Sequence, residues 1–145
     1  MNYALNILLN PDKSKVLMQL KDRSIYAGKY NFPGGKLQLN HETMRNGALR
    51  ELNEETGVTP DQIPDFQWLG TLTIAHDCQP GREDRNATLI FFAATIDETI
   101  PKQQPGETEP LEWRPVNTIN QMAEQGMLAG NGELPYFLGE ALRAL

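Results

Sequence analysis

The stretch Gly34–Val58, GGKLQLNHETMRNGALRELNEETGV, decides the fold, because it predicts a glycine-led loop followed by a helix. Apolar and small side chains recur in it at spacings of three and four, which is typical of a helix packed on one side: Met44, Ala48, Leu49, Leu52 and Thr56. Thr43 can cap the first turn, and Gly57 stands where a left-handed C-cap is expected. We therefore predict a helix from Thr43 to Thr56.

Acidic side chains gather in the second half of this helix. Glu51 lies three residues before Glu54 and four before Glu55, and the last two are adjacent. The three carboxylates can therefore converge on one region. Such like charges destabilise a bare helix by a few tenths of a kcal/mol per pair, and Arg50 offsets part of this. A glutamate cluster by itself is most often a solvated surface. The glycine loop beside it favours a site for a hard divalent cation, which prefers oxygen ligands.

The same stretch resembles the Nudix box, in which Gly, five residues, Glu and seven residues precede Arg-Glu-U-X-Glu-Glu-X-Gly-U, with U apolar. The matching positions are Glu42, Arg50, Glu51, Leu52, Glu54, Glu55, Gly57 and Val58. The preceding Phe32-Pro33-Gly34-Gly35-Lys36 also resembles the usual approach to the box. Six residues, 36–41, stand where the family has five. We interpret this as a one-residue insertion within Leu37–His41, which a loop accommodates at low cost.

The resemblance implies a Mg²⁺- or Mn²⁺-dependent hydrolase of nucleoside diphosphates linked to another group. It implies that water attacks a phosphorus atom while metal ions stabilise the charge on the phosphate oxygens. Carried over by position, the expected metal ligands are Glu51, Glu54 and Glu55, with the Gly34 carbonyl as a further ligand. Arg50 and Glu42 are expected to pair and to orient these ligands.

Further site residues are expected outside the box. Lys36 is the candidate for a direct phosphate contact. The resemblance also implies a glutamate in a later loop, from which many family members take their general base or another metal ligand. Here that loop is 97–110, and Glu109 is our first choice, with Glu107 second. Phe32 is a candidate for stacking on a base, although core packing is the plainer interpretation. Asn131 could bind a base edge through its amide, although an Asn-Gly turn would also explain it.

The rest of the chain predicts strands and helices in irregular alternation. Expected strands cover residues 3–9, 15–20, 66–75, 87–96 and 111–116, and expected helices cover 118–125 and 134–145. The first two strands form a hairpin around Asn10-Pro11-Asp12. The proline and two glycines at 33–35 are not expected in a helix or a central strand. The pattern predicts an α/β or α+β class with a mixed sheet in one domain, 1–145, and the resemblance implies an α/β fold, the Nudix-type α/β/α sandwich.

Composition limits the partners. A net charge of −6 argues against nonspecific nucleic-acid binding. No apolar run approaches the length of a membrane span, and no signal peptide is recognisable. Cys78 is the single cysteine, so a reducing cytoplasm is the expected location. The loop residues His76, Asp77, Arg82 and Arg85 are interpreted as ordinary surface. Monomer and homodimer both stay open.

Three functions therefore remain in view. The first is a compact MutT-like pyrophosphohydrolase acting on a nucleoside triphosphate, with oxidised nucleotides among the candidate substrates. The second is the same enzyme class acting on ADP-ribose, a nucleotide sugar or a dinucleoside polyphosphate. The third is a Nudix-like module that only binds a nucleotide, against which the complete glutamate set argues.

Overall fold

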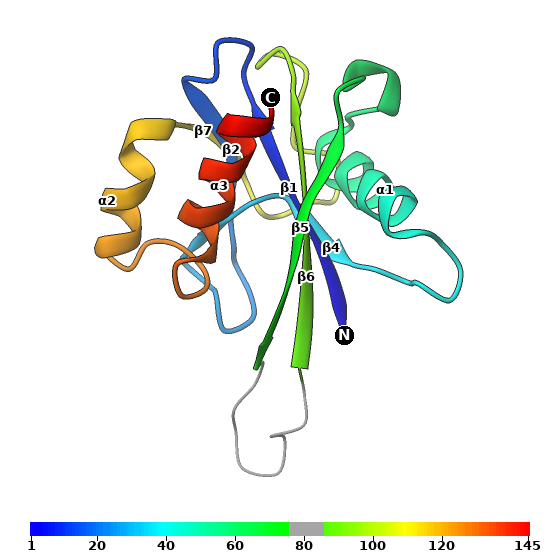
Figure 1. Cartoon of the computed structure of the whole chain (residues 1–145), viewed down its shortest axis with the longest axis horizontal. Helices are drawn as coiled ribbons and strands as arrows, with labels where there is room; N and C mark the ends of the chain where they lie inside the picture. Colours follow the sequence, from blue (N-terminus) through cyan, green and yellow to red (C-terminus); the bar gives the residue numbers. More distant parts are fainter. Residues whose placement is uncertain (76–85) are drawn as a thin grey trace.

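A mixed β-sheet forms the middle of the molecule in the computed structural model, which describes residues 1–75 and 86–145 (Figure 1). Its strands are β1 (Asn2–Leu9), β2 (Lys15–Leu20), β3 (Tyr30–Asn31), β4 (Gly34–Lys36), β5 (Gln67–Ala75), β6 (Asn86–Thr95) and β7 (Leu111–Pro115). The order is β3-β2-β1-β6-β5, with β4 paired to β1 and β7 to β2. Strands β1 and β6 are parallel, and the other pairs are antiparallel.

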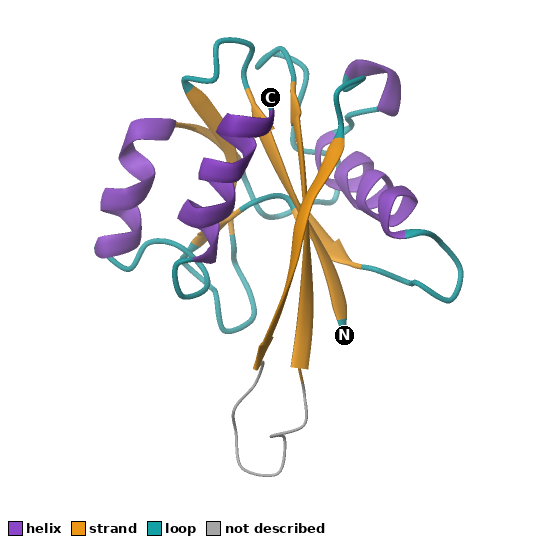
Figure 2. Cartoon of the chain, in the orientation of Figure 1, coloured by secondary structure: helices purple, strands orange, loops and turns teal. Residues whose placement is uncertain are grey.

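Three helices cover the two faces of this sheet. Helix α1 (Met44–Thr56) lies on one face, and α2 (Ile119–Glu124) and α3 (Glu133–Ala144) lie on the other (Figures 1 and 2). Short 3-10 turns at Pro60–Gln62 and Val116–Thr118 complete the helical segments. The predicted α/β/α sandwich is thus confirmed. Within the described residues, no helix combines the length and apolarity needed to cross a membrane.

Alternation along β1 explains the two layers. Leu5, Ile7 and Leu9 belong to the core beneath α2 and α3, whereas Ala4 and Leu8 belong to the core beneath α1. Successive side chains of a strand point to opposite faces, so a central strand that is apolar on both faces requires cover on both. The first predicted hairpin is confirmed by the antiparallel pairing of β1 with β2.

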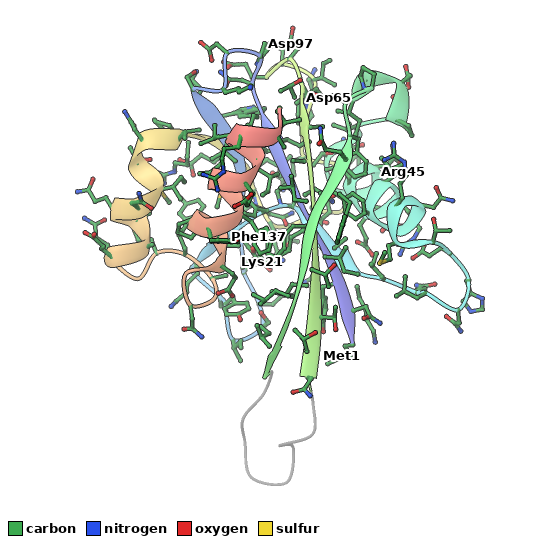
Figure 3. The ribbon with its side chains drawn as sticks, in the orientation of Figure 1. Met1, Lys21, Arg45, Asp65, Asp97 and Phe137 are labelled. Carbon is green, nitrogen blue, oxygen red and sulfur yellow. The ribbon has the colours of Figure 1, made fainter. Side chains whose placement is uncertain are left out.

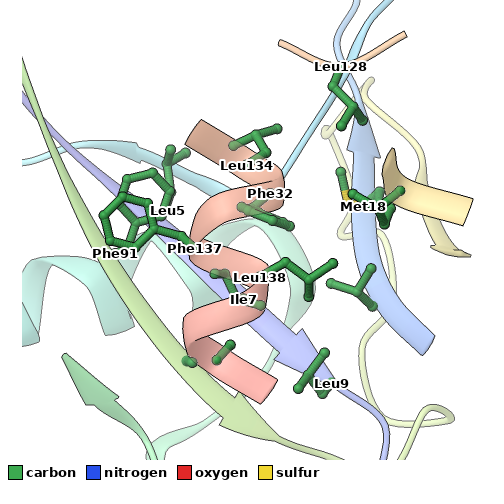
Figure 4. Close-up of a cluster of buried hydrophobic side chains, with 14 of the residues drawn as sticks. Leu5, Ile7, Leu9, Met18, Phe32, Phe91, Leu128, Leu134, Phe137 and Leu138 are labelled. Carbon is green, nitrogen blue, oxygen red and sulfur yellow. The ribbon is translucent and has the colours of Figure 1, made fainter. Parts of the chain in front are cut away.

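The core beneath α3 is built around stacked aromatic rings (Figure 4). The rings of Phe91 and Phe137 lie 3.8 Å apart between centroids, with an interplanar angle of 8°. Phe32, Leu134 and Leu138 pack in the same cluster. Each fully buried side chain of this kind contributes about 1.5–3 kcal/mol, and this cluster therefore fixes α3 against the sheet.

Helix α1 begins and ends as predicted. The Thr43 hydroxyl oxygen accepts a hydrogen bond from the Asn46 amide at 3.1 Å. Gly57 adopts a left-handed φ of 75°, and its N–H donates to the Asn53 carbonyl. Leu52 is buried as expected, but Met44 is 43% exposed, because the first turn extends past the edge of the core.

Gly34 and Gly35 lie in the short strand β4 rather than in the expected loop, and β4 pairs with β1 alone and is not a central strand. Strand β4 pairs antiparallel with β1, placing Leu5 opposite Gly34. A Cβ atom on Gly34 would lie 1.9 Å from the Ala4 carbonyl oxygen, so only glycine permits this approach. Pro33 precedes the strand, and its carbonyl accepts the Asn6 amide proton at 2.8 Å. The absence of a side chain on Gly34 therefore permits the close pairing of β4 with β1.

A turn at residues 38–42 accommodates the extra residue that we interpret as an insertion within Leu37–His41. The Gln38 carbonyl accepts hydrogen bonds from the amides of His41 at 2.9 Å and Glu42 at 3.1 Å. The Gln38 amide in turn donates to the Glu42 carboxylate at 2.9 Å. The preceding Leu37 stays buried beneath α1. The turn thus absorbs the extra length while Glu42 keeps its place beside the helix.

Candidate functional site

Arg50 and Glu42 form the ion pair that links the loop to α1. Arg50 donates from Nε to one Glu42 oxygen at 2.9 Å and from Nη2 to the other at 2.7 Å. This two-bond geometry is the strong form of an arginine–carboxylate contact. The Arg50 hydrogen bonds lower the pKa of Glu42 to about 2. The expected pairing of these two residues is present.

The same guanidinium also holds two of the clustered glutamates. Arg50 Nη1 lies 2.9 Å from Glu51 Oε1 and 3.2 Å from Glu54 Oε1. The Glu51 side chain is 15% exposed and that of Glu54 is 56% exposed. Arg50 donates hydrogen bonds to the carboxylates of Glu42, Glu51 and Glu54, and these bonds raise the pKa of Arg50. The bond to Glu42 has the largest effect. One cation is therefore shared among three carboxylates.

Glu55 is the most buried carboxylate of the cluster, with 8% of the residue exposed. Its Oε2 accepts the Gly34 amide proton at 2.9 Å. The pKa of Glu55 is raised to about 8, and burial is the largest cause. The charge of Lys21 and the Gly34 hydrogen bond oppose this rise, whereas the charges of Glu107 and Glu51 add to it. Burial also raises the pKa of Glu51. Both carboxylates therefore lie where additional positive charge would stabilise their ionised forms.

The backbone of β4 passes directly against the glutamates. A Cβ atom on Gly35 would lie 2.2 Å from Glu51 Oε2. A Cβ atom on Gly47 would lie 2.7 Å from Glu42 Oε1 and from a methyl carbon of Leu37. Glycine at both positions thus permits a close approach between backbone and carboxylate, which also explains a glycine inside a helix.

The donor set suits a hard divalent cation, but the side chains are held by other partners. Among residues 1–75 and 86–145, no three acidic, histidine or cysteine side chains are already arranged around a single metal position. Glu51 and Glu54 bind Arg50, and Glu55 binds the Gly34 amide. Three carboxylates on two successive helical turns supply the oxygen ligands that Mg²⁺ prefers. The partly uncompensated burial of Glu55 is the feature that a cation would relieve, so the residues fit the metal.

The later loop brings both candidate bases close to the cluster, in different surroundings. Glu109 is 1% exposed. Its oxygens accept from Lys21 Nζ at 2.8 Å and from the Asp22 amide at 2.9 Å (Lys21 is labelled in Figure 3). Glu107 is half-buried, and its charge raises the pKa of Glu55. Both Glu109 oxygens thus accept hydrogen bonds. Within the described residues, Glu107 Oε1 accepts only the Glu109 amide proton, at 3.5 Å, and the Glu107 charge acts on Glu55.

A pocket of about 540 Å³ adjoins the cluster. Its cationic lining consists of Lys21, Arg23 and Lys36. Its apolar lining includes Ala4, Leu5, Phe32, Leu89 and Leu134, and its polar lining includes Tyr3, Tyr26, Asn31 and Glu133. Gly34 and Gly35 form the wall that the pocket shares with the acidic helix. An apolar pocket with a few polar groups and three cations can hold a ring system with attached phosphates.

The expected binding residues divide between this pocket and other places. Lys36 and Phe32 line the pocket, although Phe32 is only 1% exposed and belongs mainly to the core. Asn131 instead lines a second hollow between β5 and α3, beside Tyr136. The predicted surface residues His76, Asp77, Cys78, Arg82 and Arg85 lie outside the described part of the chain.

Several pocket residues were not among the expected site residues. They are Lys21, Asn31 and Glu133. Asn31 directly precedes Phe32 at the approach to the glycines, and this position was its available signal. Glu133 gives no comparable signal, because only the packing of α3 brings it to the pocket.

Comparison with known proteins identifies clear relatives. The family model described as NUDIX domain matches residues 2–131. An 8-oxo-dGTP diphosphatase of Escherichia coli is 29% identical over 117 residues, covering 81% of both chains. One of Proteus vulgaris is 34% identical over 95 residues, covering 66% of this chain and 76% of that protein. The NUDIX domain of Shewanella oneidensis NrtR, solved with ADP ribose, aligns over 99% of this chain and 86% of that one, with a TM-score of 0.72 and 19% identity.

Proposed function

Because the chain belongs to the NUDIX domain family and is a Nudix hydrolase, we propose that it cleaves oxidised purine nucleoside triphosphates such as 8-oxo-dGTP, releasing pyrophosphate. The observation that carries this proposal is the wall shared by the pocket and the acidic helix. Gly34 donates its amide proton to Glu55, Gly35 lies against Glu51, and both glycines line the pocket. A base and sugar in the pocket would therefore direct their phosphates toward the glutamates.

Nudix hydrolases act with divalent metal ions, and we propose Mg²⁺ or Mn²⁺ here. Glu51, Glu54 and Glu55, with the Gly34 carbonyl, would hold the ion. When bound, it supplies charge stabilisation on the phosphate oxygens and a more acidic water nucleophile. Arg50 would release Glu54 and Glu51 toward the ion while keeping its two bonds to Glu42. The two bonds to Glu42 would keep the guanidinium in place beside the residues that hold the ion.

Substrate binding and proton transfer fall to residues around the cluster. Lys36 and Arg23 line the pocket and would bind the phosphates, Arg23 while lying 3.9 Å from Asp22 Oδ1 through its Nε. Glu107 would accept the proton of the attacking water, because Glu109 is already hydrogen-bonded at both oxygens. Glu109 would hold Lys21 against this site. The apolar lining around Leu89 and Leu134 would exclude water from the base.

ADP-ribose is the second candidate substrate. The NrtR NUDIX domain solved with ADP ribose shares the fold, with a TM-score of 0.72. The 8-oxo-dGTP diphosphatases weigh more, because their sequences align over most of the chain at higher identity. We further propose one domain over residues 1–145 in the cytoplasm, as monomer or homodimer. Nucleic acid is not an expected partner at a net charge of −6.

A nucleotide panel tests the proposal. The purified protein is incubated with Mg²⁺ and 8-oxo-dGTP, dGTP, ADP-ribose or a dinucleoside polyphosphate, and the products are separated and identified. The proposal expects pyrophosphate and 8-oxo-dGMP, with kcat/KM for 8-oxo-dGTP above that for the other compounds. AMP and ribose 5-phosphate formed faster from ADP-ribose would select the alternative. No turnover of any compound would refute the enzymatic assignment.

A further inference from the structure

Ile25 is a large apolar side chain that stands in solvent beside the pocket. It is 71% exposed, the largest fraction among the large apolar side chains of residues 1–75 and 86–145. It is also the only one of these exposed side chains that lines the pocket of about 540 Å³. A single exposed apolar residue is ordinary on a protein surface, so its place at the pocket is the feature that requires a reason.

A closed loop between β2 and β3 carries Ile25 (Figure 1). At its neck, the Lys21 amide donates a hydrogen bond to the Lys29 carbonyl at 2.9 Å, and the Gly28 amide donates to the Lys21 carbonyl at 2.8 Å. Compact loops whose ends lie close together are frequently functional. The two neck bonds fix both ends of the loop at the pocket, because Lys21 itself lines the pocket.

The neighbours of Ile25 anchor the tip of this loop on either side. Tyr26, the next residue, packs against the core beneath α3 and also lines the pocket. On the other side, the Asp22 amide donates to a Glu109 carboxylate oxygen at 2.9 Å, and the Asp22 carboxylate accepts the Thr108 hydroxyl proton. Ile25 belongs to neither hydrophobic core of the described residues. The loop therefore holds Ile25 at the pocket without burying it.

The pocket combines surfaces that suit the two ends of a nucleotide. Leu89 and Leu134 contribute to its apolar lining, and Arg23 and Lys36 contribute to its cationic lining. A purine ring has two flat apolar faces, and packing one of them against an aliphatic side chain removes both surfaces from water. Arg23 and Ile25 lie two residues apart, so one loop brings a cation and an apolar group to the same pocket.

We propose that Ile25 is a substrate-binding residue that covers one face of the base of the bound nucleotide. Its side chain leaves water when the base binds, and the apolar area buried in this way strengthens nucleotide binding. Because Ile25 carries no group that ionises or binds a metal ion, it contributes to the affinity for the nucleotide and not to the cleavage step. The inference rests on the proposed function, since it places a nucleotide base in this pocket.

The test measures the affinity for nucleoside monophosphates by isothermal titration calorimetry with Mg²⁺ present. The probes are 8-oxo-dGMP, dGMP and AMP, which have no diphosphate linkage to cleave. Ile25→Ser should weaken the tightest of these about tenfold, because burial of most of an isoleucine side chain is lost. Ile25→Leu should bind nearly as the unmodified protein does, since it restores the apolar cover. Tyr136→Ser removes an exposed side chain outside the lining of this pocket, and this matched control should bind unchanged.

Two further measurements separate binding from folding. Ile25→Ser should leave unchanged both the midpoint of thermal unfolding and the Mn²⁺ affinity, which electron paramagnetic resonance measures without nucleotide. The side chain is exposed and lies outside the glutamate cluster, so a change in either quantity would assign Ile25 to the fold and overturn the proposal.

The binding data can also overturn the proposal directly. A loss of affinity below about threefold in Ile25→Ser would do so, as would a loss in Ile25→Leu as large as that in Ile25→Ser. If the unmodified protein binds none of the probes, the nucleotide pocket and the role of Ile25 are both refuted. If the probes bind as expected but 8-oxo-dGTP is not hydrolysed, the proposed function alone fails.

Discussion

Replacing Glu55 with glutamine is expected to stabilise the metal-free protein at neutral and alkaline pH. The pKa of Glu55 is raised from 4.5 to about 8, with burial as the largest cause. Between these values the folded state retains a proton that the unfolded state has released, so stability falls as pH rises. Because one pKa unit corresponds to about 1.4 kcal/mol, ionisable Glu55 weakens the fold by about 3 kcal/mol between pH 4.5 and pH 7. Glutamine removes this dependence and still accepts the Gly34 hydrogen bond.

Urea denaturation with EDTA at pH 5, 6, 7 and 8 measures the effect. The free energy of unfolding of the unmodified protein should fall across this range, whereas that of Glu55→Gln should fall much less, because only the raised pKa of Glu51 still contributes. Glu124→Gln, on the exposed end of α2, is the control and should follow the unmodified protein. Excess Mg²⁺ should restore the free energy of unfolding of the unmodified protein at pH 8, because a bound cation favours the ionised Glu55 carboxylate. Equal slopes for Glu55→Gln and the unmodified protein would refute the reasoning.

Glu42 is expected to make the free energy of unfolding depend on pH in a more acidic range. Its pKa is lowered to about 2, chiefly by the Arg50 hydrogen bonds. The stability that this pair contributes is therefore present above pH 4.5 and is lost as pH falls toward 2. The two carboxylates thus titrate in separate ranges, and the measurements above pH 5 report on Glu55 without interference from Glu42.

Two further predictions concern the surroundings of the cluster. Gly35→Ala should weaken Mn²⁺ binding about tenfold or more, because the added methyl group would displace the Glu51 carboxylate. Isothermal titration calorimetry measures the Mn²⁺ affinity. An unchanged affinity would contradict the close approach of the Gly35 backbone to Glu51. Glu107→Gln should lower kcat at least about a hundredfold with stability unchanged, whereas Glu109→Gln should lower stability by about 2 kcal/mol through loss of its pair with Lys21. Steady-state kinetics and urea denaturation on both variants separate these roles, and the reverse pattern would restore Glu109 as the base.

The parts of the fold that local sequence determines could be predicted. Helix α1 has its cap at Thr43, its left-handed glycine at 57 and a stripe of small and apolar residues, and each signal acts within a few residues. The hairpin of β1 and β2 and the sandwich class follow from apolar runs and turn residues in the same way. The pair of Arg50 with Glu42 could be expected from a motif.

The parts that depend on contacts between distant segments could not be predicted. Gly34 and Gly35 signal flexibility in the sequence, yet they form a strand because β1 and Glu51 approach their backbone. The burial of Glu109 against Lys21 joins residues 88 positions apart. Glu133 and Asn31 share a pocket only because α3 packs beside the loop that precedes the glycines. Neither hydrophobic periodicity nor local residue spacing predicts such contacts between distant segments.

The central claim is that the glutamates of α1 carry metal-dependent cleavage of a nucleotide. Its most direct test is the steady-state rate of pyrophosphate release from 8-oxo-dGTP with saturating Mg²⁺, for the unmodified protein and for Glu54→Gln. Glu54 is 56% exposed, so its replacement should leave the fold and its circular dichroism spectrum unchanged. A lost metal ligand should raise the barrier by about 3–4 kcal/mol and lower kcat by about 10²–10³-fold. A kcat within threefold of the unmodified protein would contradict the account.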